Sequence, residues 1–325
     1  PKDLETMLQL VYLYFTSPRQ DETAFNAYLK LYDGILTNRA NNPSSALQDT
    51  VLVTMAGYHP RVRPMTAELL DEINFKKLHY IFRERFGDPG NFTFYFVGNI
   101  DMEKAEPLIL TYLGGLPKVK RPETWKDNNI RPPAERIEKT VIRDMEVPKG
   151  TVNINFTSVY DYDNPMDRMA LSALCDILDV RYTETIREEQ GGTYGVGVYA
   201  SQVHYPWEHY NVRISFDCDP ENVDKLKGIA YEEINRLIQE GPKAKDLQGV
   251  KKNLLKSRAE RLKKNDFWLS SLEDIDYHGM EVKDFFNYED MVNSMTIESL
   301  KDAAGRFFGV NPIEVILLPS DNAEN

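Results

Sequence analysis

Apolar and polar positions alternate along several stretches of this chain, and this alternation predicts strands. Residues 151–159 place valine, isoleucine and phenylalanine on one face and asparagine on the other. Such a pattern is typical of an antiparallel strand with one buried face. Further strands are predicted over residues 193–200 and 210–216, where apolar residues again recur at every second position.

A long helix is predicted between the first two of these strands, from about Pro165 to Gln190. Its apolar residues recur at helical spacing, and Asn164 followed by Pro165 supplies an N-cap and a first-turn proline. Gly191 and Gly192 then end the helix, and the chain leads into a strand that is rich in glycine. Bare glycines in a strand indicate a face that another group approaches closely.

This helix-to-strand turn brings together Arg187 and Tyr194, which are our candidate site residues. The guanidinium keeps its charge at any working pH, and both side chains donate hydrogen bonds. A structural interpretation is also open, in which Arg187 caps its own helix and Tyr194 packs on the sheet. The turn by itself does not separate the two interpretations.

The order of elements repeats along the chain. Tyr58-His59 and Phe86-Gly87 recur as Tyr277-His278 and Phe308-Gly309, roughly 220 positions later. Each Phe-Gly pair precedes an apolar stretch that predicts a strand, and two helices are predicted before each Tyr-His pair. The strands cover residues 92–97 and 313–318, and the helices cover residues 21–36, 44–55, 221–239 and 244–264.

The first copy lacks the leading strand and the long helix of the second copy. It opens with the apolar residues 8–15, which we interpret as a strand, although their spacing also allows a short helix. Residues 117–138 are rich in proline and charge and are predicted as a linker. The predicted fold is therefore α+β, with two homologous αβ units over residues 1–116 and 139–325. Each unit is expected to pack a mostly antiparallel sheet with helices, and the first is truncated at its N-terminus.

These features resemble the C-terminal half of the inverted zinc peptidases, the family of pitrilysin, insulin-degrading enzyme and the mitochondrial processing peptidases. Arg187 and Tyr194 match an arginine and a tyrosine that in this family reach a peptide held at a zinc ion in the other half. Residues 82–86 and 96–101 are also similar to the family's pattern. The resemblance implies four homologous units in two halves that close like a clam shell. It identifies our first unit with a truncated third domain and our second unit with the fourth.

The family's zinc-binding motif, H-x-x-E-H on a helix, does not occur in this sequence. The nearest string runs from His204 to His209, and its two histidines are spaced so that a helix would not present both on one face. Pro206 also disfavours a helix there, and our interpretation is a hairpin turn. We therefore expect zinc in the full enzyme to be bound outside this chain and no metal to be bound by the chain itself.

Composition argues against several other classes of function. The chain has 325 residues and a formal net charge of −12, which disfavours nucleic acid as the main partner. No stretch is apolar for long enough to predict a membrane span. The two cysteines have no metal-binding spacing and do not decide the compartment, which we expect to be periplasmic or otherwise extracytoplasmic. The basic residues between Lys251 and Lys264 indicate a solvated helix face or, alternatively, a contact for an acidic partner half.

The sequence therefore predicts the non-zinc-binding half of a zinc metallopeptidase, and this chain alone is expected to be inactive. We expect the chain to bind the peptide and to close the catalytic chamber, and we expect Arg187 and Tyr194 to contact the substrate. Its expected partners are peptide substrates and an N-terminal catalytic half, on the same polypeptide or on a partner subunit. The alternative is a non-catalytic scaffold or regulatory subunit of the same family, which would need neither residue.

Overall fold

The computed structural model describes residues 3–121, 123–189 and 195–320, with residues 187–189 described by their backbone alone. The chain forms two compact units, each assembled from separate stretches of sequence. The first unit comprises Pro1–Arg39, Met65–Trp125 and Leu262–Asp274, and the second comprises Ala40–Pro64, Lys126–Arg261 and Ile275–Asn325. The division predicted from sequence, with a linker over residues 117–138, stays a prediction.

The described residues of the first unit form helices. These are α1 (Leu4–Thr16), α2 (Glu22–Ala40), α4 (Phe75–Phe86) and α5 (Met102–Tyr112), with short 3-10 helices at Ala67–Glu72 and Pro89–Asn91. α9 (Asn265–His278) begins in this unit and ends in the second. The helix predicted over residues 21–36 is confirmed as α2.

Two strands predicted in the first copy are wrong. Residues 8–15 belong to the helix α1, and residues 92–97 form neither a helix nor a strand. The ring of Phe15 lies 5.0 Å from that of Phe92 and 6.0 Å from that of Phe94, so aromatic packing engages these apolar side chains. The described residues of this unit contain no strand that could supply backbone partners, whereas a helix such as α1 satisfies its own.

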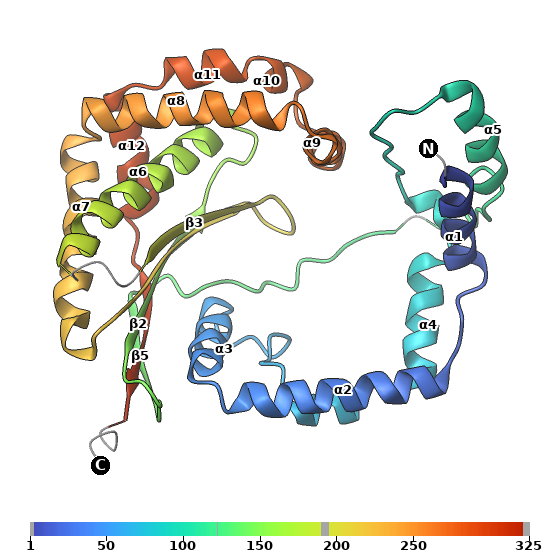
Figure 1. Ribbon diagram of the computed structural model, residues 1–325, viewed down its shortest axis with the longest axis horizontal. Helices are drawn as coiled ribbons and strands as arrows, with labels where there is room; N and C mark the ends of the chain where they lie inside the picture. The colour runs from blue at the N-terminus through green and yellow to red at the C-terminus, as the bar shows by residue number, and fades with distance from the viewer. Residues whose placement is uncertain (1–2, 122, 190–194, 321–325) are drawn as a thin grey trace. The chain divides into compact units, whose positions relative to one another are not determined.

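The second unit contains a sheet, of which β2, β3 and β5 are labelled in Figure 1. Its five strands have the order β1-β5-β2-β4-β3. Its strands are β1 (Ile137–Arg143), β2 (Gly150–Val159), β3 (Val196–Val203), β4 (His209–Cys218) and β5 (Ile313–Pro319). β1 pairs with β5 in parallel, and the other neighbours pair antiparallel. The predicted α+β class is confirmed. The sequence did not reveal β1, because that strand begins within the residues predicted as linker.

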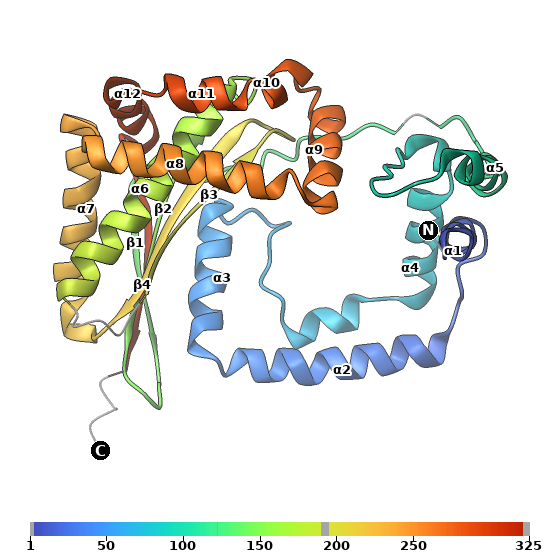
Figure 2. The same ribbon diagram turned by 45° about the horizontal axis from the view of Figure 1, so that its top comes forward.

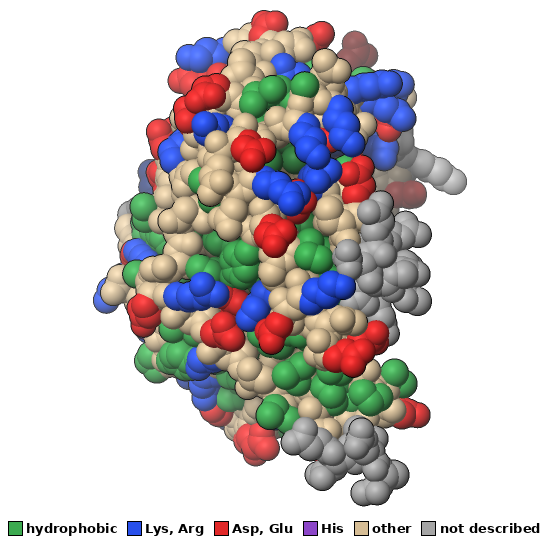
Figure 3. All heavy atoms as spheres, turned by 90° about the vertical axis from the view of Figure 1, so that its left-hand side faces the viewer, with side chains coloured by type: hydrophobic (Ala, Val, Ile, Leu, Met, Phe, Trp, Pro, Cys, Tyr) green, Lys and Arg blue, Asp and Glu red, His purple; other side chains and the backbone are tan. Residues whose placement is uncertain are grey.

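Helices cover one face of this sheet. They are α6 (Pro165–Glu189), α7 (Val223–Glu240) and α12 (Ile297–Phe308), and α8 (Ala244–Arg261), α10 (Val282–Phe286) and α11 (Tyr288–Ser294) complete this side of the unit (Figures 1 and 2). The long helix predicted from Pro165 and the two predicted over residues 221–239 and 244–264 are confirmed. Figure 3 shows the side on which α7 lies, where acidic and basic side chains are interleaved.

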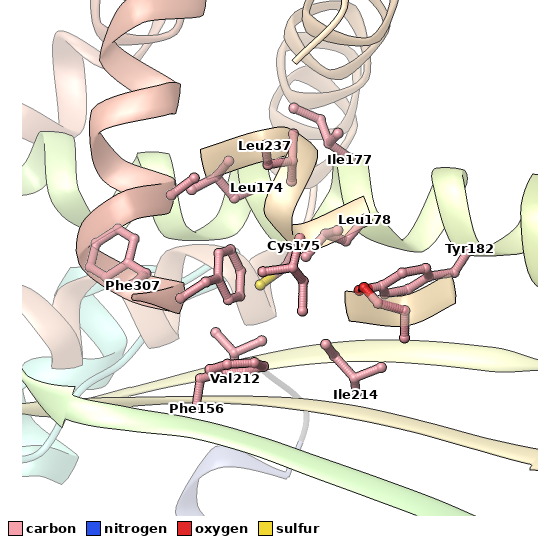
Figure 4. Close-up of a cluster of buried hydrophobic side chains, with 14 of the residues drawn as sticks. Phe156, Leu174, Cys175, Ile177, Leu178, Tyr182, Val212, Ile214, Leu237 and Phe307 are labelled. Atoms are coloured by element: carbon pink, nitrogen blue, oxygen red, sulfur yellow. The ribbon is translucent and has the colours of Figure 1, made fainter. Parts of the chain in front are cut away.

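The main core lies between these helices and the sheet (Figure 4). Phe156 of β2 and Val212 and Ile214 of β4 are at most 2% exposed, and they pack in one cluster with Leu174 and Leu178 of α6. Burying one such side chain contributes roughly 1.5–3 kcal/mol relative to leaving it exposed. This cluster therefore fixes α6 and the three strands β2, β4 and β3 relative to one another.

The opposite face of the sheet is covered only in part. α3 (Pro43–Met55) lies over β1 and β5, where Leu47 packs with Val141, Val315 and Leu317 (Figure 2). This is the helix predicted over residues 44–55, which the sequence places in the first copy. On β2 and β4 the same face carries polar side chains, which are buried at Asn153 and Asn155 of β2 and exposed at Arg213 of β4. The part of this face around β4 and β3, called the uncovered face below, is the setting of the candidate site.

Candidate functional site

The two residues singled out by the sequence belong to the junction between α6 and β3. Tyr194 lies outside the described residues, and Arg187 is described only by its backbone within α6. The positions of both side chains therefore stay a prediction. The described residues on either side of the junction show how its two ends are held.

The last turns of α6 are fixed against α7. Ile186 and Tyr182 are buried, and the Tyr182 hydroxyl donates a hydrogen bond of 2.9 Å to the carbonyl of Ala230. Burial raises the pKa of Tyr182, so its hydroxyl stays protonated and able to donate. Arg181 makes a two-point contact in which Nε and Nη2 each lie 3.2 Å from a carboxylate oxygen of Glu233. Together these contacts restrict the helix end that carries Arg187.

α6 also holds β3, which forms one edge of the sheet. The backbone N–H of Val198 donates to Oδ1 of Asp179 on α6 at 3.2 Å. That N–H therefore points away from β4, as do the backbone groups of alternate residues along β3. Edge groups of this kind can pair with an extended peptide. The sequence did not reveal Asp179, because a carboxylate that binds a backbone group leaves no motif.

A groove of about 470 Å³ lies on the uncovered face of the sheet. Three elements contribute to its lining. The lining residues include Gly195 and Gly197 at and before the start of β3, Arg213 of β4, and Ser44 and Gln48 of α3. Gly195 directly follows Tyr194 in the sequence. The groove therefore begins one residue after the predicted substrate-contacting tyrosine.

In the glycine-rich strand β3, the ring of Tyr199 lies against the backbone of the same strand at Gly197. A Cβ atom at Gly197 would lie 2.6 Å from the ring of Tyr199, which is closer than real side chains allow. Glycine at this position lets the ring lie over the strand, and the guanidinium carbon of Arg213 lies 5.0 Å from the ring centre. The close approach predicted from the bare glycines is thus made by Tyr199. At Gly195 no described atom would lie within 4 Å of an added Cβ.

The charged side chains of the groove differ in whether an oppositely charged side chain lies next to them. Lys149 Nζ lies 2.7 Å from Oδ2 of Asp217, and the Thr151 hydroxyl donates to Oδ1 at 2.6 Å. Both oxygens of Asp217 are therefore engaged. Among the residues that the structure describes, none supplies a carboxylate within ion-pair distance of Arg213. Alternation along residues 210–216 could have revealed Arg213, since it places that residue on the face opposite Val212.

The described residues do not fit a zinc site. They contain no group of three or more histidine, cysteine, aspartate or glutamate side chains able to hold a metal ion. In the nearest arrangement, Nδ1 of His204 lies 3.3 Å from Nδ1 of His278, and Oε1 of Glu208 lies 3.4 Å from Nε2 of His204. Glu208 thus meets the other ring nitrogen, so the three groups cannot converge on one ion. Residues 204–208 instead connect the antiparallel strands β3 and β4, as the predicted hairpin turn requires.

Sequence comparisons relate the chain to zinc proteases. A family model described as the peptidase M16 inactive domain matches residues 72–254. The chain is 28% identical over 286 residues to a zinc protease PQQL-like protein of Arabidopsis thaliana, covering 83% of this chain and 30% of that protein. It is 23% identical over 242 residues to the probable zinc protease PqqL of Escherichia coli, covering 73% and 26%. The chain therefore spans less than a third of the length of these relatives.

Solved structures share the fold at low sequence identity. The periplasmic protease PqqL from Escherichia coli matches with a TM-score of 0.82 and 19% identity, covering 98% of this chain and 35% of that one. A protease from Helicobacter pylori matches with a TM-score of 0.79 and 14% identity, covering 98% and 78%. The first half of PqqL also matches, with a TM-score of 0.70 and 16% identity over 99% and 71%. At these identities the likeness shows a common fold.

Proposed function

Because the chain belongs to the M16 peptidase family and matches its inactive domain, we propose that it forms the C-terminal half of a zinc endopeptidase. In this proposal it binds the peptide and closes the catalytic chamber, while another half holds the metal. Its relatives are named zinc proteases, and its own described residues do not fit a zinc site. A division of labour between two halves accounts for both observations.

The groove on the uncovered face of the sheet is the observation that carries the proposal. Its lining includes Gly195, which follows Tyr194 in the sequence, and polar side chains such as Arg213 and Ser215. A peptide lying extended next to β3 could pair with the edge groups of that strand, which bind without regard to side-chain identity. Asp179 already accepts the N–H of Val198, so such a peptide would displace this carboxylate or pair on either side of it.

The proposed work of Tyr194 and Arg187 is to donate hydrogen bonds to the substrate. The acceptor is the oxygen of the scissile carbonyl or of its neighbour, as negative charge develops there. One such donor is worth roughly 3 kcal/mol in other hydrolases. Donors act most effectively when they are held in place beforehand, and the attachment of α6 to α7 through Tyr182 and Arg181 supports this.

The partner in this proposal is an N-terminal catalytic half, on the same polypeptide or on a separate subunit. Zinc and the attacking water belong to that half. We also propose an extracytoplasmic location, because the Escherichia coli structural relative is described as a periplasmic protease. In the described part of the chain, no helix is both long and apolar enough to cross a membrane.

Substitution of Tyr194 in the complete enzyme tests the proposal. Tyr194→Phe should lower kcat roughly ten- to a thousandfold and leave the zinc content unchanged, because one transition-state donor is lost. Arg187→Ala should also weaken substrate binding. Tyr277→Phe is a matched control, since this tyrosine is 65% exposed and lies outside the groove, and it should leave kcat unchanged. The 325-residue chain alone should cleave no peptide.

A non-catalytic scaffold is the second candidate, and the description of the matched domain as inactive favours it. A scaffold needs neither donor. If Tyr194→Phe and Arg187→Ala both kept the wild-type kcat/KM on several peptides, the two residues would be structural and the scaffold would be the better assignment.

A further inference from the structure

We propose that Arg213 and Tyr199 form a subsite in the groove that binds a carboxylate of the peptide. This inference deepens the proposed function and rests on it, because it takes the uncovered face of the sheet as the surface that meets the peptide. The carboxylate belongs either to an acidic side chain or to the C-terminus of the peptide. The experiment below separates these two sources.

The subsite is a layered arrangement built from two neighbouring strands. Gly197 lies at the base, the ring of Tyr199 lies over it, and Arg213 lies over the ring. Tyr199 and Arg213 are directly paired in the register of β3 and β4, so the arrangement does not depend on a loop. Stacking on an aromatic ring restricts the guanidinium while its N–H groups stay available at the edge of the plane. Both side chains are exposed, so a ligand can reach them.

The electrostatics of the groove select a negatively charged ligand. Lys149 balances the charge of Asp217, whose other oxygen accepts a hydrogen bond from the hydroxyl of Thr151, and among the described side chains Arg213 is left without a carboxylate partner. Ser44, in the first turn of α3, also lines the groove, and that turn contains no acidic residue. The positive end of the helix dipole thus adds to the attraction.

The geometry of Arg213 favours a carboxylate in particular. A guanidinium presents parallel N–H groups that match the two oxygens of a carboxylate. Among the described side chains that line the groove, Arg213 is the cation without a carboxylate partner, and its one charge balances one unit of negative charge, whereas a doubly charged phosphate would call for more. The half-buried side chain of Ser215 also lines the groove and can hydrogen-bond to the peptide around the carboxylate.

The test is equilibrium binding of four fluorescein-labelled peptides to the 325-residue chain, measured by anisotropy. The peptides share one sequence of alanine and serine, with a central glutamate or glutamine and a free or amidated C-terminus. The wild-type chain should bind a carboxylate-bearing peptide about three- to tenfold more tightly than the neutral one. Loss of this preference on changing glutamate to glutamine indicates the side chain as the source, and loss on amidation indicates the C-terminus.

Variants assign the preference to the proposed subsite. Arg213→Gln should reduce the affinity ratio to about one, and Arg213→Lys should retain part of it. Gly197→Ala should also reduce the ratio without changing any charge, because its Cβ displaces the ring beneath Arg213. Arg143→Gln is the matched control, since this exposed arginine lies on β1 of the same sheet, and it should leave the ratio intact. Circular dichroism verifies that each variant is folded.

Two results would overturn the inference. The first is an unchanged ratio in a folded Arg213→Gln variant, and the second is an equal loss in Arg143→Gln, which would indicate attraction by net charge alone. Either result leaves the proposed function standing if the peptides still bind. Failure of all four peptides to bind the wild-type chain would instead contradict peptide binding by this face, and the proposed function with it.

Discussion

The two faces of the second-unit sheet differ in what they contribute to the protein. Under α6 and α7 the face is apolar and closed, and Val212 and Ile214 of β4 are fully buried there. On the other face the intervening residue, Arg213, is exposed and lines a groove. Successive side chains of a strand point to opposite faces, so one strand can supply the core with every second residue and a binding surface with the others.

The largest effect expected from this comparison is loss of stability on the closed face. Leu174→Ala should lower the free energy of unfolding by about 2–5 kcal/mol, because it leaves a cavity beneath a fully buried helix position. Val180→Ala, at a position of α6 that is 46% exposed, is the control and should cost far less. On the open face, Arg213→Gln should change stability by less than about 0.5 kcal/mol. Urea unfolding followed by circular dichroism measures all three, and equal losses on both faces would contradict the comparison.

A smaller effect is expected where a buried charge pair fixes the end of α6. Glu233 is 5% exposed and accepts hydrogen bonds from Arg181 and from Arg236. Glu233→Gln should cost about 1–3 kcal/mol, because Arg181 loses the buried one of its carboxylate partners and keeps only the more exposed Glu184, which lies 3.0 Å from it.

Glu232→Gln removes the neighbouring carboxylate, whose side chain is 69% exposed and lies 3.9 Å from Arg236, and should be nearly neutral. The comparison of melting temperatures for the two variants measures the difference. Equal melting temperatures would mean that the pair contributes nothing beyond a surface contact.

The smallest effect concerns pH and belongs to the open face, where His209 begins β4. Burial lowers the pKa of His209, and it outweighs the hydrogen bond with the carbonyl of Trp207, which raises the pKa, while the nearby charge of Arg131 adds to the lowering. The folded state therefore favours the neutral ring, which stacks on Trp207 with ring centres 3.9 Å apart. This contribution is complete above the unfolded pKa of about 6.5 and is lost as the pH falls through the lower folded value.

His209→Gln should accordingly make stability less dependent on pH in the range just below 6.5. Melting temperatures measured across that range test this expectation. Leu174→Ala serves as the contrast, because loss of an apolar side chain should lower stability by a similar amount at each pH. A wild-type pH dependence in the His209→Gln variant would contradict the assignment to this ring.

The fold could be predicted where local pattern and tertiary packing agree. Alternation located β2 and β4, and helical spacing with Asn164-Pro165 located α6. Prediction failed for residues 8–15 and 92–97, because a strand requires neighbours that an apolar pattern cannot guarantee. Sequence spacing likewise does not reveal the contact partners of a residue when they lie on elements far away in the sequence.

The candidate site was predicted in part. The bare glycines of β3 indicated a close approach, although the approaching group, Tyr199, became evident only in the structure. Arg213 was passed over because residues 210–216 were interpreted for their buried face alone. Asp179 and Glu233 hold the frame of the site through contacts across distant sequence, and such contacts leave no local pattern. The assignment of Arg187 and Tyr194 stays a prediction.

The strand order also bears on how this chain is made. β5 lies between β1 and β2, although β1 precedes it by well over a hundred residues in the sequence. During synthesis the sheet cannot close until the ribosome has released β5. Until then β1 lacks its strand partner and α3 lacks the residues Val315 and Leu317 that it covers, and exposed strands and apolar surface favour aggregation. Severing the chain in the stretch 117–138 would place α3 and the sheet that it covers on separate pieces.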